Sequence, residues 1–487
     1  MKAKTKAKPS SKTTTKATAK KAAPKKATTK KTTKAVSAKT AKTKAKATTK
    51  AKPKTKAKTK TKSRTRKKDS INMALLKKAR HFRNLGHKRV GMIFSGGPAP
   101  GTNAVISTAA IQFLNANYDV IGFYKGYEFL EQFDRNNPKK LVEGVHYKSL
   151  GYDDVTKIRQ RGGCILRTAR AHPSRIGDKE IETLKDLVNP KMARKLYNVL
   201  DAMEYVGVSS LISIGGDGTL KTAYYLSLLG VPVVHVPKTI DNDYYGIPWT
   251  FGYFSAIEQA RQDLQTYNIE VRTTECYFVI ETMGHKAGWY TLGAGIAGEA
   301  IRMIGPEEIQ GELDLDALID DLCQLVMKRK ALGKPYGVIM VSEGLVDKLP
   351  KSKKPKKLDA HGNVRLSSAK IGKTIAEMLK ERYTQTTGKS LTVKNETIGY
   401  TTRCVEPNAF DVLLGSQLGM GAFQLIDSGS FGNMVSVGDN LEIKKVPFTK
   451  LIDPETFKTA IRFVPLDGDF FKLAQSLEFR ALTKDGE

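Results

Sequence analysis

From about residue 88 onward, short apolar runs alternate with longer stretches in which apolar residues recur every three to four positions. Continuous apolar runs between polar or Gly-rich turns are typical of buried strands, and the helical spacing predicts helices. The predicted strands are residues 89–94, 118–123, 209–213, 231–236, 276–282 and 336–341. The predicted helices are residues 103–115, 220–229 and 314–332. This alternation predicts an α/β fold with mostly parallel sheets covered by helices on both faces.

Two polar segments stand directly after two of the predicted strands. Residues 214–220 read Ile-Gly-Gly-Asp-Gly-Thr-Leu, and residues 237–243 read Pro-Lys-Thr-Ile-Asp-Asn-Asp. A Gly-rich turn at the carboxyl end of a strand lets the backbone approach a phosphate, and the following helix supplies N–H donors. The second segment adds carboxylates and a lysine, which suit metal, proton and phosphate chemistry. Together the two segments indicate phosphoryl transfer.

The positive charge of the chain is concentrated at its N-terminus. Residues 1–68 hold 28 of the 82 Lys and Arg and none of the 48 Asp and Glu, which leaves a net charge of +6 on the remaining residues. This basic segment consists almost entirely of Lys, Ala, Thr, Ser and Pro, a texture that resembles the tail of a linker histone. A segment so poor in apolar residues is expected to be disordered.

Three interpretations of the basic segment stay open. It is a solvated polycation without a partner, a segment that binds nucleic acid or another polyanion by neutralising phosphates, or a targeting peptide. The Lys-rich composition and the missing apolar helical face argue against targeting. There is no secretory hydrophobic region and no run of about 18 apolar residues, so the sequence predicts no membrane span.

The body of the chain, residues 69–487, is long enough for two α/β lobes. Its Lys- and Pro-rich stretch at 351–365 predicts a surface loop. The four cysteines are widely scattered and form no Cys-x-x-Cys pair, so neither a zinc site nor a disulfide framework is indicated. We therefore expect reduced thiols and a cytoplasmic location.

An ordered series of motifs along this body resembles the 6-phosphofructokinase superfamily, of the phosphofructokinase A type. Gly-Gly-Asp-Gly alone occurs in other nucleotide and lipid kinases, but the whole series in this order and at this spacing is specific. The series consists of Ser-Gly-Gly at 95–97, Gly-Thr-Asn at 101–103, Gly-Gly at 162–163, Thr-Ala-Arg at 168–170, Gly-Gly-Asp-Gly-Thr at 215–219, Pro-Lys-Thr-Ile-Asp-Asn-Asp at 237–243, Phe-Gly-Tyr-Phe-Ser-Ala at 251–256, Met-Gly at 283–284, Ser-Glu-Gly at 342–344 and Gly-Tyr-Thr-Thr-Arg at 399–403.

The resemblance implies two Rossmann-like lobes with mostly parallel sheets and an active site in the cleft between them. The expected organisation is a disordered tail at 1–68 and a catalytic region at 69–487. Within the catalytic region the approximate boundaries are 88–250 for the donor-binding lobe, 251–420 for the sugar-phosphate lobe and 421–487 for a C-terminal return. The resemblance also implies a glycolytic homo-oligomer, a dimer or a tetramer, and is compatible with an allosteric enzyme.

The implied reaction is transfer of a phosphoryl group from ATP to O1 of fructose 6-phosphate, giving fructose 1,6-bisphosphate and ADP with Mg²⁺ as cofactor. Pyrophosphate as the donor is the first alternative. Relatives that use pyrophosphate tend to have Asp at position 218 and Lys at position 238, whereas one ATP-using branch combines Gly with Lys. Gly218 leaves room for the α-phosphate of ATP and, with Lys238, favours the Gly–Lys branch. An alternative of another class is a polyanion-binding protein with a regulatory or inactive kinase body.

The resemblance further assigns roles to single residues. Asp241 is expected to be the general base, Lys238 the second catalytic residue and Asp217 the Mg²⁺ ligand. The expected donor-phosphate ligands are Gly97, Arg170, Gly216, Asp217, Gly218 and Thr219. The expected sugar-phosphate ligands are Thr239, Ile240, Asp241, Met283, Gly284, His285, Glu343, Tyr400, Thr401, Thr402 and Arg403. Arg403 is expected to grip the 6-phosphate as a fork.

Ordinary structural roles compete with these assignments. Thr239 can form a local Ser/Thr turn, and Glu343 or Arg403 can belong to a surface ion pair. Two departures from the family pattern also matter. His285 stands where the family usually has Arg and is a weaker, pH-dependent cation. Arg167 stands where many relatives have Gly and brings a bulky cation toward the expected donor pocket.

Overall fold

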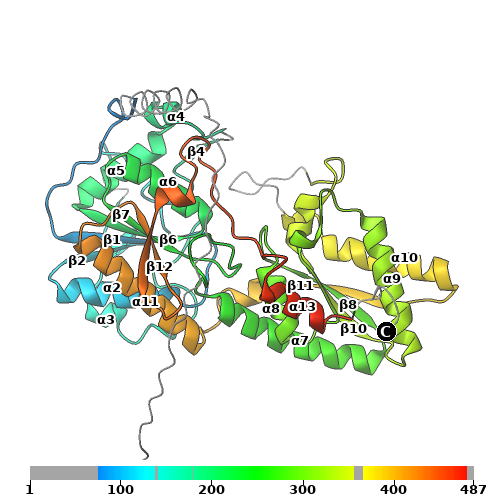
Figure 1. The fold of residues 1–487 in the computed structure, drawn as a ribbon. Helices are drawn as coiled ribbons and strands as arrows, with labels where there is room; N and C mark the ends of the chain where they lie inside the picture. The colour runs from blue at the N-terminus through cyan, green and yellow to red at the C-terminus, as the bar shows by residue number, and fades with distance from the viewer. Residues whose placement is uncertain (1–74, 138–140, 178, 356–365, 480–487) are drawn as a thin grey trace, which may run out of the picture. The chain divides into compact units, whose positions relative to one another are not determined.

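The first and largest of three β-sheets in the described residues has seven strands in the order β13-β12-β7-β6-β1-β2-β3 (Figure 1), and the smallest is the pair β4-β5. The computed structural model describes residues 75–137, 141–177, 179–355 and 366–479. The strands of this sheet are β1 (Arg89–Ser95), β2 (Asp119–Phe123), β3 (Tyr147–Ser149), β6 (Ser210–Gly215), β7 (Val233–Pro237), β12 (Asn433–Val437) and β13 (Ile443–Pro447). The run from β12 to β2 is parallel, and β3 and β13 pair antiparallel at the edges. The central strands β6 and β7 are buried along their whole length, as their continuous apolar runs predict.

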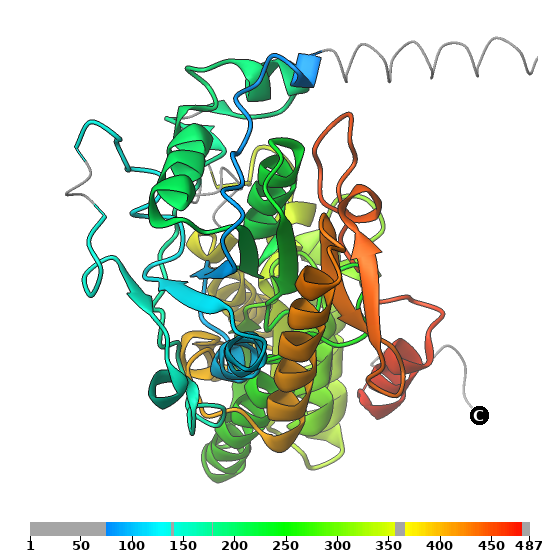
Figure 2. The same ribbon diagram turned by 90° about the vertical axis from the view of Figure 1, so that its left-hand side faces the viewer.

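Helices cover both faces of the first sheet. α2 (Thr102–Asn115) and α11 (Ala409–Asp427) pack side by side, and Figure 2 shows them as the blue and orange helices. The approach is close because α11 presents glycines: a Cβ at Gly419 would lie 2.5 Å from the carbonyl oxygen of Val105. α6 (Asp217–Leu228) packs against β6 and β7. Since parallel crossovers are right-handed and the two connections run in opposite directions along the sheet, α2 and α6 lie on opposite faces.

The second sheet has four parallel strands in the order β11-β8-β10-β9. Its strands are β8 (Tyr277–Thr282), β9 (Arg302–Ile304), β10 (Gly337–Ser342) and β11 (Val393–Ile398). Its helices are α7 (Tyr253–Thr274), α8 (Trp289–Ala297), α9 (Leu315–Ala331) and α10 (Ile371–Thr387). α10 packs against β8, β11 and α9, whereas α7 packs against β10 and α8. The polar turns after β8 and β10 therefore emerge from one edge of this sheet.

Shorter elements complete the described part of the chain. They are α3 (Tyr152–Val155), β4 (Arg175–Ile176), β5 (Lys179–Glu180), α4 (Leu184–Val188), α5 (Arg194–Val206), α12 (Phe448–Leu451), α13 (Asp469–Leu477) and 3₁₀ turns at Pro306–Glu308, Glu343–Lys348, Leu366–Ser368 and Tyr400–Thr402. α13 packs against α8. The chain therefore returns from the first sheet to the second before the described residues end.

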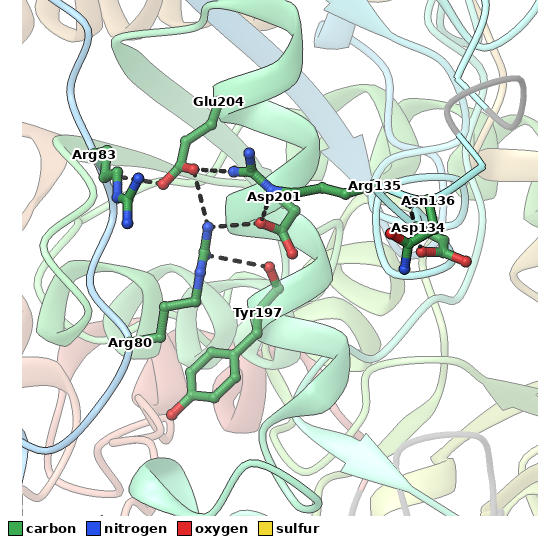
Figure 3. A network of polar contacts seen from close by, with 8 residues as sticks. All are labelled: Arg80, Arg83, Asp134, Arg135, Asn136, Tyr197, Asp201 and Glu204. Atoms are coloured by element: carbon green, nitrogen blue, oxygen red, sulfur yellow. Dashed lines mark hydrogen bonds and ion pairs between the residues drawn. The ribbon is translucent and has the colours of Figure 1, made fainter.

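The segment before β1 is tied to α5 by arginines and carboxylates (Figure 3). Arg80 Nη2 donates to Asp201 Oδ1 at 2.6 Å and to Glu204 Oε2 at 2.9 Å. The backbone N–H of Arg83 donates to Glu204 Oε1 at 2.8 Å, and Arg135 contacts both carboxylates. Glu204 is buried, so these cationic and N–H partners offset the loss of its hydration. The network fixes the path by which the chain enters the first sheet.

The α/β fold and every strand and helix predicted from the apolar pattern are confirmed. The basic segment with its predicted disorder, and most of the predicted loop at 351–365, lie outside the described residues. The sequence predicts no membrane span, yet α11 is long and apolar enough to cross a membrane by length and composition alone. Half of its most apolar 18-residue stretch is buried in the structure. The expected lobe boundary at residue 420 falls inside α11. Because α11 packs mainly against α2, β7, β12 and β13 of the first sheet, we propose that the return begins at Ala409.

Candidate active site

The turn between β6 and α6 carries the Gly-Gly-Asp-Gly-Thr motif. A Cβ at Gly215 would lie 2.4 Å from Thr219 Oγ1, so this close turn requires glycine. Gly216 caps α6 and Asp217 begins it. The exposed Asp217 accepts the N–H of Gly218 at its Oδ1, at 2.7 Å. The turn thus combines a helix N-terminus with one carboxylate, an arrangement suited to phosphate and a cation.

The turn after β1 lies next to the loop that carries Arg170. Gly96 has a φ of 90°, a left-handed conformation that favours glycine. Its N–H donates to the carbonyl oxygen of Ala169 at 3.2 Å, and its carbonyl oxygen accepts the hydroxyl of Thr168 at 2.6 Å. Arg170 itself is exposed. These bonds place the Thr-Ala-Arg and Ser-Gly-Gly motifs side by side.

Arg167, one of the two departures from the family pattern, lies in the same loop. Its φ is 57°, so the backbone at this position is one that glycine adopts at less cost. Its exposed guanidinium lies 5.2 Å from the centre of the Tyr124 ring. The arginine is therefore held by a cation–π contact within the first lobe.

Lys238 lies at the end of β7, directly beside the first motif. Its N–H donates to the carbonyl oxygen of Gly215 at 3.0 Å. The side chain is buried, with its ammonium 5.7 Å from the centre of the Phe94 ring. Burial, followed by the nearby charge of Arg403, lowers the pKa of Lys238 to about 8. An ammonium stripped of water in this way gains strongly from a phosphate anion.

Thr239 and Asp241 form a local turn within the second motif. Thr239 Oγ1 donates to Asp241 Oδ2 at 2.9 Å and accepts the N–H of Asp241 at 3.0 Å. The other oxygen of the carboxylate, Oδ1, is shielded and has no hydrogen-bond partner among the described residues. Burial and Asp243 raise the pKa of Asp241, whereas Arg403 and His285 lower it. An oxygen left without a donor can receive a substrate hydroxyl proton.

The second motif is held in place by a residue that the sequence analysis missed. Arg462 donates from Nη2 and Nε to the carbonyl oxygen of Asn242 at 2.8 and 3.2 Å, and from Nη1 to that of Pro248 at 2.7 Å. The guanidinium lies 4.3 Å from the centre of the Trp289 ring, at the start of α8. Burial lowers the pKa of Arg462 to about 10. No motif marks this residue, because its partners lie far away along the chain.

The second sheet brings the motifs at 283–284 and 399–403 together. The N–H of Met283 donates to the carbonyl oxygen of Ile398 at 3.2 Å. A Cβ at Gly399 would lie 2.4 Å from Met283 Cγ, so the contact requires glycine. The buried hydroxyl of Thr402 donates to the carbonyl oxygen of Gly399 at 2.7 Å. Thr402 therefore shapes the turn that carries Arg403.

Arg403 points toward the first sheet. Its guanidinium carbon lies 3.6 Å from the place that a Cβ on Gly97 would occupy, and 5.4 Å from the centre of the Tyr400 ring. Its charge also helps to lower the pKa of Lys238. The expected role of Arg403 at the sugar 6-phosphate stays a prediction, but the observed position is beside the turn expected to bind the donor.

His285 connects residues from the two sheets. Its Nδ1 lies 3.1 Å from Asp243 Oδ2, in the turn after β7, and its N–H donates to Glu343 Oε1 at 3.1 Å, after β10. Burial alone would lower the pKa of His285, but the hydrogen bond and charge of Asp243 raise it to about 10. Burial and the charge of Asp241 raise the pKa of Glu343 to about 7.

Asp217 is the residue expected to hold Mg²⁺. Between residues 75 and 479, outside the three short gaps, no group of three or more His, Cys, Asp or Glu side chains could hold a metal ion. A cation bound by three or more such side chains does not fit this part of the chain. Mg²⁺ held by one or two carboxylates, with water and substrate phosphates completing its shell, does fit Asp217.

The structure brings most of the expected residues to the ends of β6, β7, β8 and β10. The expected residues with buried side chains are Thr219, Lys238, Thr239, Ile240, Met283 and Thr402. Those with exposed side chains are Arg170, Asp217, Tyr400 and Thr401. The ion pair between His285 and Asp243 joins the turns of the two sheets, whereas the bond from His285 to Glu343 lies within the second sheet.

The family model described as phosphofructokinase matches residues 89–426, which include all of these motifs. The chain belongs to the phosphofructokinase family. A pyrophosphate–fructose 6-phosphate 1-phosphotransferase of Thermotoga maritima is 33% identical over 419 residues, which cover 82% of this chain and 92% of the relative. An ATP-dependent 6-phosphofructokinase of Corynebacterium efficiens is 30% identical and covers 76% of this chain and 98% of the relative. Relatives of this phosphofructokinase thus include both donor types.

Solved structures share the fold. Phosphofructokinase from Saccharomyces cerevisiae matches with a TM-score of 0.58 at 21% identity, over 80% of this chain, which spans only half of the yeast chain. A pyrophosphate-dependent phosphofructokinase from Nitrosospira multiformis matches with a TM-score of 0.57 at 16% identity, over 82% of this chain and 94% of the other. These likenesses support the phosphofructokinase fold and leave the donor undetermined.

Proposed function

We propose that this phosphofructokinase transfers a phosphoryl group from ATP to O1 of fructose 6-phosphate, giving fructose 1,6-bisphosphate and ADP in glycolysis. The proposal is carried by the surroundings of the Asp241 carboxylate, which suit a proton acceptor. One of its oxygens is fixed by Thr239, and the other has no partner among the described residues. The charges of Arg403 and His285 lower the pKa of Asp241, and the charge of Asp241 in turn acts to raise the pKa of Lys238.

The proposed step is an in-line displacement. The hydroxyl at O1 gives its proton to Asp241 while O1 forms a bond to the terminal phosphorus of the donor. The bond between that phosphorus and the bridging oxygen breaks, and ADP leaves with the electron pair. Lys238 and Arg403 would offset the negative charge on the transferring group. Mg²⁺ held at Asp217 would supply further charge neutralisation on the donor phosphates.

The two sheets would bind different parts of the reactants. The turns at Gly97, Arg170 and 215–219 would hold the donor phosphates through backbone N–H groups and a guanidinium. The sugar phosphate would lie between the motifs of the second sheet and the turn that follows β7 of the first. Its proposed ligands are Thr239, Ile240, Asp241, Met283, Gly284, His285, Glu343, Tyr400, Thr401, Thr402 and Arg403. This division would place the active site where the ends of the two sheets meet.

ATP is the proposed donor because position 218 is glycine, which leaves space for an α-phosphate. Lys238 is found with both donors in the family and does not decide the question. Pyrophosphate is therefore the alternative, and the Thermotoga maritima relative gives it weight.

The deciding assay measures fructose 1,6-bisphosphate formation by the full chain with Mg²⁺ and either ATP or pyrophosphate as sole donor. Turnover with ATP alone would support the proposal. Turnover with pyrophosphate alone would overturn the donor assignment, and no turnover with either would favour an inactive or regulatory kinase body.

We further propose a cytoplasmic homo-oligomer whose basic segment binds nucleic acid without sequence preference. The support is the 28 basic residues without any acidic one in residues 1–68. Removing these residues should leave turnover unchanged and abolish salt-sensitive binding to double-stranded DNA. Unchanged DNA binding by the truncated chain would contradict this role.

A further inference from the structure

His285 occupies a junction that neither sheet could build alone. Asp243, its ion-pair partner, follows β7 of the first sheet, and Glu343, which accepts its N–H, follows β10 of the second. The residue has a φ of 53°, and the space around its carbonyl is tight, because a Cβ on Gly344 would lie 3.0 Å from that oxygen. The imidazole is therefore fixed by the first sheet and the backbone of His285 by the second.

The imidazole faces an excess of acidic groups. Those whose charges act on it are Asp217, Asp241 and Asp243, and the carboxylate of Glu343 contacts its backbone. The cations of the same region are Lys238, Arg403, Arg462 and Lys286. The charges of Lys238 and Arg403 interact with Asp241, and that of Arg462 interacts with Asp243. Lys286 is the next residue in the chain. Asp243 contacts the imidazole directly, with 3.1 Å between its Oδ2 and Nδ1 of His285. The His285 side chain is 30% exposed.

We propose that His285 is a positioning residue that stays positively charged, fixes Asp243 through an ion pair and keeps Asp241 available as the proton acceptor. This inference rests on the proposed function. Without a positive charge at position 285, Asp241 would lie beside Asp243 with one compensating cation fewer. Two carboxylates so close together hold a proton more tightly, so the acceptor would be blocked over a wider range of pH.

The direction of the electrostatic effect supports this role. Asp243 raises the pKa of Asp241, and the charge of His285 lowers it. The raised pKa of His285 itself, about 10, keeps the imidazole protonated throughout the neutral range. His285 thus supplies the fixed charge that an arginine would supply at this position, although it reaches Asp243 through a shorter side chain.

The kinetic test compares His285→Gln and His285→Arg with the wild-type chain in pH profiles of kcat/KM for fructose 6-phosphate. His285→Gln keeps a group that can bond to Asp243 but removes the charge. We expect the acid limb of the Gln variant to move to higher pH by about one unit. Its kcat/KM should therefore fall by about tenfold on the acid side of that limb and change little at high pH. His285→Arg should restore the wild-type limb. An exposed histidine before β1, His87, provides the control His87→Gln.

A purely structural role predicts a different kinetic result. The Gln variant would then lose activity equally at every pH, and the Arg variant would not restore it. Either of these results would overturn the proposal.

A second measurement does not depend on turnover. The chain has seven histidines, so histidine-labelled wild-type protein can be titrated by NMR without substrates. The resonance absent from His285→Gln should stay in the imidazolium form beyond pH 8, and Asp243→Asn should bring its titration down toward the ordinary histidine range. Titration of His285 near pH 6.5 in the wild-type chain would refute the proposal. If the wild-type chain forms no fructose 1,6-bisphosphate, the proposed function fails while this titration still decides the charge of His285.

Discussion

Arg462 donates two hydrogen bonds from its guanidinium to the carbonyl oxygen of Asn242, which lies 220 residues earlier in the chain. Asn242 stands between Asp241 and Asp243 and has a φ of 54°. Its amide oxygen accepts the N–H of Thr250 at 3.0 Å. The conformation that aims the two aspartates is thus held on both sides by the body of the protein.

The first prediction follows from this contact. Arg462→Met should leave the carbonyl oxygens of Asn242 and Pro248 without their donor, at a cost of about 2–4 kcal/mol in the free energy of unfolding. Because the turn would loosen, kcat should fall by about tenfold or more. Urea unfolding and steady-state kinetics measure the two effects. Arg382→Met is the control, since Arg382 pairs with exposed carboxylates and its loss should cost under about 1 kcal/mol.

A second prediction concerns the proton acceptor. Asp241→Asn should keep the hydrogen bond from Thr239, because an amide oxygen also accepts, but it removes the base. We expect kcat to fall by about 10²–10⁴-fold with little change in KM for fructose 6-phosphate. The exposed Asp467 offers Asp467→Asn as a matched control. A fall of less than about fivefold at every pH would exclude Asp241 as the general base.

A third prediction uses the position of Arg403. Because its guanidinium lies beside Gly97, Arg403→Ala should raise KM for the phosphoryl donor and lower kcat, whereas Arg403→Lys should recover part of the loss. If Arg403 also binds the sugar 6-phosphate, as proposed above, the alanine variant would in addition lose the preference for fructose 6-phosphate over fructose. Kinetics with both sugars and a varied donor concentration separate these outcomes.

The parts of this site that the sequence predicted are those fixed by local rules. The apolar run that ends in Gly-Gly predicted the turn after β6, because the turn at Gly215 accepts no other residue. The apolar run that ends in Pro-Lys predicted the turn after β7. The Ser/Thr turn at Thr239, in which the hydroxyl accepts the N–H of Asp241, was likewise anticipated as an alternative. These features depend on residues that are neighbours in the chain.

The parts that the sequence did not predict depend on folding at long range. Arg462 carries no motif, and only the return of the chain to the second motif gives it partners. The direction of the Arg403 side chain depends on how the two sheets pack together, and the apolar pattern of the sequence does not predict that packing. The pairing of His285 with Asp243 joins two motifs whose positions were predicted but whose contact was not.

A fourth prediction tests the phosphoryl donor at position 218. Gly218→Asp would add bulk and negative charge at the N-terminus of α6, where an α-phosphate of ATP is proposed to lie. It should lower kcat/KM for ATP by at least about 100-fold and leave any activity with pyrophosphate largely intact. Gly151→Asp is the control, because a Cβ there meets nothing within 4 Å and its φ is −101°. Equal losses with both donors would show that position 218 does not select the donor.

The last prediction concerns stability and pH at Glu343. In the folded chain burial and Asp241 raise the pKa of this carboxyl to about 7, from an ordinary value near 4.5. The folded state therefore binds more protons than the unfolded state between those values, so the free energy of unfolding falls as pH rises through that window.

Glu343→Gln cannot ionise in either state, yet its amide oxygen can still accept the N–H of His285. The variant should match the wild-type chain near pH 5 and exceed it above pH 7, by up to about 2 kcal/mol after allowance for partial exposure of the carboxylate. Urea unfolding at pH 5, 6, 7 and 8 measures this difference. Glu381→Gln, at an exposed position on α10, should show a constant difference across the series. A wild-type stability that rises between pH 5 and 7, with no divergence of the Glu343 variant, would mean that this carboxyl is ionised throughout and is not held protonated by its surroundings.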